Sequence, residues 1–421
     1  MELTKDDRTL RKPSPTPTPS HRALPWLVAV GLVLTALNLR PAISGVGPVL
    51  AEVRDDLGMG GTVAGLLTSL PALCFGVFGF AAPRLARRFG PVAVVLAGLT
   101  AIAAGLAVRS LAGSTALFLV TTTVALAGIA VGNVLMPVLA RRYFPDRLGT
   151  ITGLYSMAFA LGAASAAALT IPLTALANDS WRAGLAFWAA AAAVAVVPWL
   201  AVLLSARRRE RATGPAAPPP PAPADEPAAP RLVRSRTAWA LALFFGLQAT
   251  AAYIIIGWAP QIFRDAGVSA GSAGLMLAVI MGLGAPLGFV LPRVATRLRH
   301  QGPLVVTLGV CGLAGYAGLW LAPAGGAWVW AVLLGLANCA FPVAITMIGM
   351  RARTGAGVAR LSAFAQSAGY LMCIPGPLLV GTLNDLTGGW HAPLAFMTVL
   401  MVAQIAAGVA AGRDRCVEDG E

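Results

Sequence analysis

The sequence predicts an all-α membrane protein with twelve transmembrane helices in two pseudo-symmetric six-helix bundles. Three observations lead to this prediction. Of the 421 residues, 57% are hydrophobic and only 11% are charged, whereas a soluble domain carries roughly 25% charged residues. Twelve apolar runs reach the length of about 20 residues with which an α-helix crosses the hydrocarbon core. Finally, the two halves of the chain resemble each other in sequence.

The apolar runs divide the chain into two sets of six. They fall near residues 24–46, 61–82, 91–110, 116–139, 150–172 and 183–205, and again near 237–258, 272–292, 303–322, 327–350, 361–383 and 392–411. We therefore expect one bundle over residues 24–205 and a second over residues 237–411. Residues 1–23 form a disordered tail and residues 412–421 a second tail. The Pro/Arg-rich stretch 206–236 cannot bury a core and is expected to be a disordered linker.

Four segments of the first half recur in the second half, in the same order and roughly 205 to 210 residues later. The pairs are EVRDDLGMGGTVAGL (52–66) with IFRDAGVSAGSAGL (262–275), GFAAPRLARRFG (79–90) with GFVLPRVATRLR (288–299), NVLMP (133–137) with NCAFP (338–342), and SWRAGLAFW (180–188) with GWHAPLAFM (389–397). Chance similarity between Ala/Gly-rich helices explains one such pair but hardly four. The chain is therefore interpreted as a duplicated six-helix unit.

The net charge of +14 could indicate a nucleic-acid partner, but the placement of the charges indicates otherwise. If the helices alternate in direction, all but five of the 31 basic residues fall on one side of the membrane. This is the positive-inside rule. It predicts a multi-pass protein of the bacterial inner membrane with both termini in the cytoplasm, and it makes a nucleic-acid partner unnecessary.

The sequence contains no recognisable nucleotide, metal or catalytic site. A phosphate-binding loop needs a lysine, and the only lysines, Lys5 and Lys12, lie in the N-terminal tail. The five cysteines have no metal-ligand spacing, and the three histidines lie at helix ends or in loops: His21, His300 and His391. We expect no enzymatic activity, no cofactor and no metal ion.

Charged residues inside a membrane are costly and usually functional. Every Asp and Glu lies outside the apolar runs. Exporters that exchange cationic drugs for protons usually keep a carboxylate in the membrane, so this absence argues against a cationic substrate.

Arg40 is the exception among the basic residues, because it lies within the first apolar run, in the segment NLRP (38–41). At about 1.5 Å per residue, it lies about 24 Å along the helix that starts at Leu24, past the midplane. Pro41 removes one backbone donor and tends to open the helix there. A guanidinium beside loosened backbone can hold a small anion through two parallel hydrogen bonds. Alternatively, Arg40 reaches the outer interface or pairs with Glu52.

Other polar residues within apolar runs are weaker candidates for the lining of a central cavity. Asn133 and Asn338 occupy equivalent positions in runs four and ten, each four residues before a proline. They either line the cavity or form hydrogen bonds between helices. The remaining candidates for substrate binding lie on runs one, five, seven and eleven: Asn38, Tyr155, Gln248 and Gln366.

Several segments of the chain resemble the major facilitator superfamily and, within it, the cyanate / 2-nitroimidazole transporter family. They are NLRP (38–41), GPVLAEVRDDLG (47–58), AGLLTSLPALCFGVF (64–78), APRLARRFG (82–90), GNVLMPVLARRYFP (132–145) and WAPQIFRDAG (258–267). The resemblance implies two six-helix bundles around a cavity near the midplane, lined mainly by helices one, four, seven and ten. It also implies alternating access by rocking of the halves.

The chain departs from the superfamily in the loop between helices two and three, where an Asp is expected. Pro83 occupies that position, and Pro292 occupies the equivalent position of the second half. The charge relay attributed to that Asp is therefore in doubt here. Arg84, Arg88 and Arg293 are nevertheless candidate gating residues, because cations interact favourably with helix C-termini.

These observations predict a secondary transporter, expected as a monomer in the lipid bilayer, that moves a small anion or weak acid resembling cyanate or a nitroimidazole. One alternative is a broad-specificity efflux carrier of neutral drugs, served by helices rich in aromatic residues and methionine. A second alternative, from another class, is a membrane receptor or scaffold that has lost transport. The missing carboxylate and the lack of a large domain outside the membrane favour the first interpretation.

Overall fold

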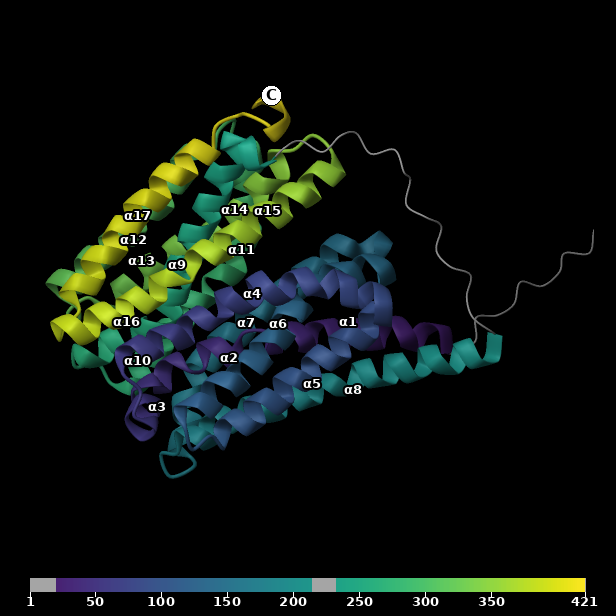
Figure 1. Cartoon of the computed structure of the whole chain (residues 1–421), viewed down its shortest axis with the longest axis horizontal. Coiled ribbons are helices and arrows are strands. Elements are labelled where there is room, and N and C mark those ends of the chain that lie inside the picture. The colour runs from purple at the N-terminus through teal and green to yellow at the C-terminus, as the bar shows by residue number, and fades with distance from the viewer. Residues whose placement is uncertain (1–19, 214–231, 421) are drawn as a thin grey trace, which may run out of the picture.

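The computed structural model describes residues 20–213 and 232–420, and every regular element in these ranges is a helix (Figure 1). Twelve helical spans in them are long and apolar enough to cross a membrane. Because lipid offers no hydrogen-bond partners, the backbone must satisfy its own polar groups, which these helices do. The predicted fold class is confirmed.

The elements of the first half are α1 (Ser20–Asn38), α2 (Pro41–Ser44), η1 (Gly47–Val49), α3 (Leu50–Leu57), α4 (Gly61–Phe89), α5 (Pro91–Ser110), α6 (Thr115–Tyr143), η2 (Pro145–Arg147), α7 (Leu148–Ala175) and α8 (Trp181–Thr213). Those of the second half are η3 (Leu232–Arg234), α9 (Arg236–Asp265), α10 (Ala270–Gly282), α11 (Gly284–Arg297), α12 (Gly302–Leu321), α13 (Ala327–Asn338), α14 (Ala340–Met350), α15 (Gly355–Cys373), α16 (Pro375–Thr387), α17 (His391–Ala411) and η4 (Val417–Gly420).

The predicted tail 1–23 and linker 206–236 fall largely outside the described residues, which omit 1–19 and 214–231. Where they are described, the structure differs from the predicted boundaries. Helix α8 continues to Thr213, and the stretch 232–236 forms η3 and the start of α9. The C-terminal tail folds back on the protein: the backbone N–H of Val417 donates to the carbonyl of Arg351 at 2.9 Å, and the Val417 side chain is buried.

The two halves form separate bundles that meet along two pairs of helices. Helix α4 packs against α15 and α16, and α7 packs against α10. Figure 1 shows the bundles close together at the end that carries α3, α10 and α16. They spread apart toward the end that carries the start of α1, the end of α8 and the C terminus.

Four of the spans are interrupted, and prolines explain the interruptions. As predicted from Pro41, the first span opens there: α1 ends at Asn38 and α2 begins at Pro41. In the second half, α10, α13 and α15 each end four residues before a proline, which are Pro286, Pro342 and Pro377. A proline cannot donate to the carbonyl four residues earlier, and its ring crowds that carbonyl.

Trp199 on α8 fastens this helix to α1. Its indole N–H lies 2.8 Å from Oγ1 of Thr35 and 3.2 Å from the carbonyl oxygen of Gly31, and the ring is fully buried. The close fit depends on Gly31, since a Cβ at that position would lie 2.9 Å from the ring.

Replacing Trp199 with Phe should therefore lower the free energy of unfolding by about 1–2 kcal/mol, the effect of losing buried hydrogen bonds to the indole. The measurement is the thermal unfolding midpoint in detergent. Trp239→Phe is the matched control, because Trp239 is exposed and donates to the carbonyl of Val233. Equal shifts in the two variants would contradict the structural role of Trp199.

Candidate functional site

A cavity of about 890 Å³ lies between the two bundles and is lined by residues of both. Its walls come from the α1–α2 junction, α6 and α7 in the first half. In the second half they come from α9, the broken helices α10–α11 and α13–α14, and α15. The interruption between α13 and α14 lies at Cys339, which also lines the cavity.

Arg40 lines this cavity at the opened α1–α2 junction. Its guanidinium carbon lies 4.6 Å from the centre of the Phe159 ring, a cation–π contact that fixes its position. The alternative pairing with Glu52 is not among the ion pairs of the described residues; the two carboxylate oxygens of Glu52 are instead bound by Arg264, at 2.8 and 2.9 Å.

Three predicted amides line the same cavity: Asn133, Gln248 and Asn338. Asn133 and Asn338, which are equivalent in the sequence repeat, lie on opposite bundles and line one space. Gln248 is 3% exposed, and its side-chain oxygen has no hydrogen-bond partner among the described residues. A buried polar atom without a partner costs free energy unless a ligand or water supplies one.

Of the remaining candidates, Tyr155 and Arg293 line the cavity. Asn38 and Gln366 are not among its lining residues, which corrects their predicted place. The amide nitrogen of Asn38 donates to the carbonyl of Leu34 at 2.8 Å. That of Gln366 donates to the hydroxyl of Ser362 at 2.7 Å. Both amide nitrogens donate within their own helices.

The other two candidate gating residues, Arg84 and Arg88, are exposed near the end of α4 and are not among the lining residues of the cavity. The guanidinium of Arg88 lies 5.2 Å from the ring of Phe89. Arg293, the counterpart of Arg84 in the repeat, is exposed at the wall of the cavity. The repeat therefore gives equivalent positions in sequence, but only one of them reaches the cavity.

Aromatic residues contribute much of the wall, and of these only Tyr155 was selected from the sequence as a binding candidate. Phe245 and Tyr370 lie edge to face with ring centres 5.1 Å apart. Phe75, which is not among the lining residues, packs against Tyr370 with ring centres 5.4 Å apart. Phe159 and Tyr253 also line the cavity. Aromatic residues in an apolar helix give no sequence signal that separates a cavity wall from a core.

The charged side chains that line the cavity are all positive. Among its lining residues in the described part of the chain, Arg40 and Arg293 are charged and no Asp or Glu is present. Amides, tyrosine hydroxyls and aromatic rings supply the remaining polar and apolar surface. This arrangement can neutralise an anion but offers no carboxylate to a cation.

At the end where the bundles meet, residues of the two halves form ion pairs. Arg264 on α9 pairs with Glu52 on α3, and Arg54 on α3 lies 3.7 Å from Asp385 on α16. The backbone N–H of Thr62 also donates to Asp385, at 2.9 Å. Arg54 and Arg264 are equivalent in the sequence repeat, so each half contributes the corresponding arginine to the other.

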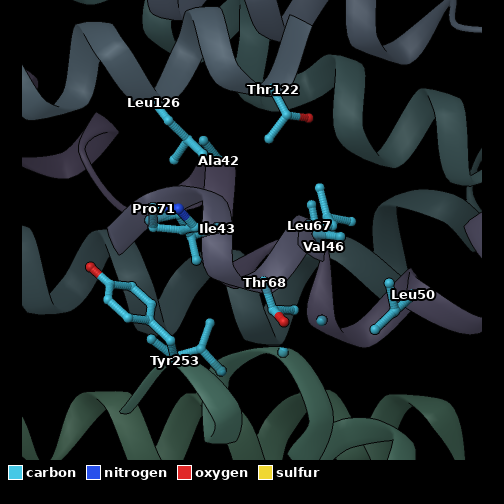
Figure 2. Close-up of a pocket in the computed structure, with 13 residues that line it drawn as sticks. Ala42, Ile43, Val46, Leu50, Leu67, Thr68, Pro71, Thr122, Leu126 and Tyr253 are labelled. Atoms are coloured by element: carbon cyan, nitrogen blue, oxygen red, sulfur yellow. The ribbon is translucent and has the colours of Figure 1, made fainter. Parts of the chain in front are cut away.

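A second, much smaller cavity of about 20 Å³ lies between the central cavity and this closed end. Figure 2 shows it between Ala42 and Val46 of the first span, Thr122 on α6 and Tyr253 on α9. Tyr253 and Ile256 line both cavities. These two side chains therefore separate the central site from the closed end.

Comparison with known proteins identifies the family. The sequence profile of the Major Facilitator Superfamily matches residues 32–377. The chain is 33% identical over 401 residues to the uncharacterized transporter YycB of Bacillus subtilis (strain 168), covering 94% of this chain and 96% of the relative. It is 32% identical over 390 residues to the 2-nitroimidazole transporter of Escherichia coli (strain K12), covering 92% and 96%. It is 30% identical over 373 residues to the cyanate transport protein CynX of the same organism, covering 88% and 93%.

Solved structures share the fold at low sequence identity. A bacterial homolog of the human lysosomal transporter Spinster superposes with a TM-score of 0.70 at 15% identity, covering 94% of this chain and 95% of that one. The nucleoside transporter NupG superposes with a TM-score of 0.66 at 13% identity, covering 92% and 97%. With its twelve spans, duplicated halves and central cavity, the chain belongs to the Major Facilitator Superfamily and is a multi-pass secondary transporter of small substrates.

Proposed function

We propose that this transporter carries a small anion or weak acid, of the cyanate or nitroimidazole type, across the bacterial inner membrane by alternating access. The observation that carries the proposal is Arg40, a cation at the wall of the central cavity whose lining includes no carboxylate among the described residues. The names of two relatives, a 2-nitroimidazole transporter and a cyanate transport protein, agree with such a substrate.

The site binds the anion through charge and amide hydrogen bonds. The Arg40 guanidinium presents several N–H donors in one plane and can hold a carboxylate-like or linear anion by two of them. Asn133 and Asn338 add neutral donors from opposite bundles, and Gln248 supplies a buried amide oxygen that can accept a hydrogen bond from the protonated form of a weak acid. Because the two bundles contribute different partners, binding depends on their relative position.

In the proposed topology, residues 24–205 and 237–411 form the two moving bundles, joined by the cytoplasmic linker 206–236. Both termini face the cytoplasm, and the protein acts as a monomer. Helices α4, α6, α8, α11, α14 and α17 all run toward the end where the bundles spread apart, and arginines lie at or just after their C-terminal ends, which supports this topology. Lys and Arg prefer the cytoplasmic side, so in this topology the central cavity opens inward and the ion-paired end is external.

In this mechanism, the bundles rock about the bound anion, and each state exposes it to one side of the membrane. The Glu52–Arg264 and Arg54–Asp385 pairs hold the external end closed while the cavity is open to the cytoplasm. Opening to the outside requires these pairs and the Tyr253–Ile256 barrier to separate. The partly exposed pairs contribute only about 0–1 kcal/mol each, so closure remains readily reversible.

The test is counterflow into proteoliposomes with cyanate, nitrite, small carboxylates and 2-nitroimidazole. We expect exchange of at least one of these compounds and no exchange in protein-free vesicles. Failure of the whole panel, in a protein that retains its thermal unfolding transition, would overturn the proposal.

A second candidate function is efflux of neutral drugs, favoured by the aromatic wall that includes Phe245, Phe341 and Tyr370. The same proteoliposomes, challenged with neutral aromatic compounds, distinguish the two. Exchange of neutral compounds that does not depend on Arg40, together with no anion exchange, would replace the first proposal with this one. A receptor or scaffold would exchange neither class.

Asn338 provides a more limited prediction for the site. Asn338→Ala should raise the KM for the transported anion by about tenfold, because it removes one hydrogen bond from the binding cavity. Gln366→Ala is the matched control, since the amide nitrogen of Gln366 donates to Ser362 and Gln366 is not among the residues lining the cavity. The concentration dependence of counterflow measures both, and equal KM values for the two variants would contradict a binding role for Asn338.

A further inference from the structure

Arg109 is a fully buried arginine on the last turn of α5, outside the lining of the central cavity. It has one hydrogen bond, from Nη1 to the carbonyl oxygen of Ala42 at 2.8 Å. Its guanidinium carbon also lies 5.6 Å from the centre of the Phe118 ring. Nε and Nη2 have no hydrogen-bond partner, and none of the ion pairs among the described residues includes Arg109.

Such an arrangement is costly, because a buried charge normally requires a counter-charge and a full set of hydrogen bonds. Arg351, the other fully buried arginine, meets this expectation. It bonds to the side chain of Gln301 and to the carbonyls of Ala411 and Gly412, and it approaches Asp414. Arg109 lacks such a set, so its one hydrogen bond, to Ala42, is the feature to explain.

The carbonyl of Ala42 needs a donor because the backbone leaves the α-helical pattern at this point. In a continuous helix, the N–H of Val46 would donate to Ala42. Here the N–H of Val46 donates instead to the carbonyl of Ile43, at 3.2 Å. The interruption of the first span therefore leaves a buried acceptor, and Arg109 satisfies it.

The acceptor belongs to the short segment that carries Arg40. Arg40 immediately precedes α2, and its own carbonyl accepts from the N–H groups of Ile43 and Ser44 at 2.9 and 3.0 Å. Figure 2 shows the next part of this segment, Ala42 to Val46, beside the small cavity that Ala42 and Val46 help to line. Arg109 thus bonds the segment at Ala42, a buried residue that also lines this cavity.

We propose that Arg109 is a positioning residue for the anion site: by bonding the Ala42 carbonyl, it fixes the opened α1–α2 junction so that Arg40 stays over Phe159 and faces the cavity. This inference rests on the proposed function for its effect on transport, but its effect on the backbone does not. Arg109 does not touch the substrate. Its influence on binding passes through Arg40.

The first test needs no substrate. Hydrogen–deuterium exchange is measured for peptides that cover residues 39–50 in the wild type and in Arg109→Met. We expect exchange at least about tenfold faster in the variant, since the segment loses the charge-assisted bond that restrains it. Arg182→Met is the matched control: Arg182 also donates to a backbone carbonyl, that of Ala112 at 3.1 Å, and pairs with Asp56. Unchanged exchange in Arg109→Met would overturn the proposal.

The second test measures the KM for cyanate and for 2-nitroimidazole in counterflow. Arg109→Met should raise the KM by about tenfold, and Arg109→Lys, which retains a charged donor, should restore most of the affinity. In an Arg40→Lys background, Arg109→Met should have a much smaller effect, because residues that act through one another are not additive. Fully additive effects would overturn the positioning role.

The two tests separate the inference from the proposed function. If the wild type transports neither anion but the 39–50 segment loosens in Arg109→Met, the proposed function fails while the structural assignment holds. If anion transport depends on Arg40 but neither exchange nor KM changes in Arg109→Met, the assignment of Arg109 fails alone.

Discussion

Arg40→Gln should reduce anion counterflow by at least about a hundredfold. The substitution removes the positive charge and the paired donors, and each hydrogen bond to a charged group contributes about 1.5–3 kcal/mol. Arg40→Lys should fall between the wild type and Arg40→Gln, because a lysine keeps the charge but not the planar pair of donors. Membrane insertion and the thermal unfolding midpoint should remain close to those of the wild type, since Arg40 is only half buried and makes no ion pair among the described residues.

The matched control is Arg88→Gln, which removes an exposed arginine that is not among the residues lining the cavity. Counterflow by this variant should stay within about twofold of the wild type, as is usual for surface substitutions. Undiminished anion uptake by Arg40→Gln would exclude Arg40 as the binding residue. A loss of folded protein in that variant would instead indicate a structural role.

Gly381→Val should arrest the transport cycle while leaving each bundle folded. Gly381 on α16 and Gly61 on α4 approach so closely that a Cβ on Gly381 would collide with the carbonyl oxygen of Gly61. The collision lies between the halves, beside Asp385, at the end that we propose to be external. A valine there prevents closure of that end, and we expect net transport to fall by at least about tenfold, the factor that corresponds to 1.4 kcal/mol against the closed state.

The position of the arrested state is read with a cysteine probe. The five native cysteines are replaced by serine, and Thr122, which lines the smaller cavity of about 20 Å³, is replaced by cysteine. A membrane-impermeant maleimide added outside should label Thr122→Cys faster in the Gly381→Val background. Gly271→Val is the control, because a Cβ on Gly271 meets nothing within 4 Å. Equal labelling and equal transport in both glycine variants would contradict the proposed external closure.

The sequence by itself determined the fold class and the approximate position of every span. The reason is physical. In lipid, a helix must form all its backbone hydrogen bonds internally and present an apolar surface as long as the hydrocarbon core is thick, so the length and composition of each run in the sequence predict a span. The repeat of segments revealed the duplicated unit, and Pro41 predicted the opening beside Arg40.

Prolines also explain why spans of the second half are broken, although the sequence alone does not indicate which prolines break a helix. Pro137 lies within the unbroken α6, whereas its counterpart Pro342 follows the break at Cys339.

The sequence determined less about the site. It selected Arg40, Asn133, Gln248, Tyr155 and Asn338, which the structure gathers in one cavity. It also selected Asn38 and Gln366, which are not among the residues that line it. An amide in an apolar helix must bond to something, but whether that is its own helix or a ligand depends on its rotation about the helix axis. Packing against neighbouring helices sets this rotation.

Only the tertiary structure decided which residues meet across the chain. The Phe159 ring contacts the guanidinium of Arg40, and Arg264 rather than Arg40 pairs with Glu52. Arg109 donates to the carbonyl of Ala42. None of these partners is close in sequence, and the sequence does not indicate which residue pairs with which. They are selected by the geometry of two packed bundles, because charge and hydrogen bonding act over a few ångströms in space regardless of separation along the chain.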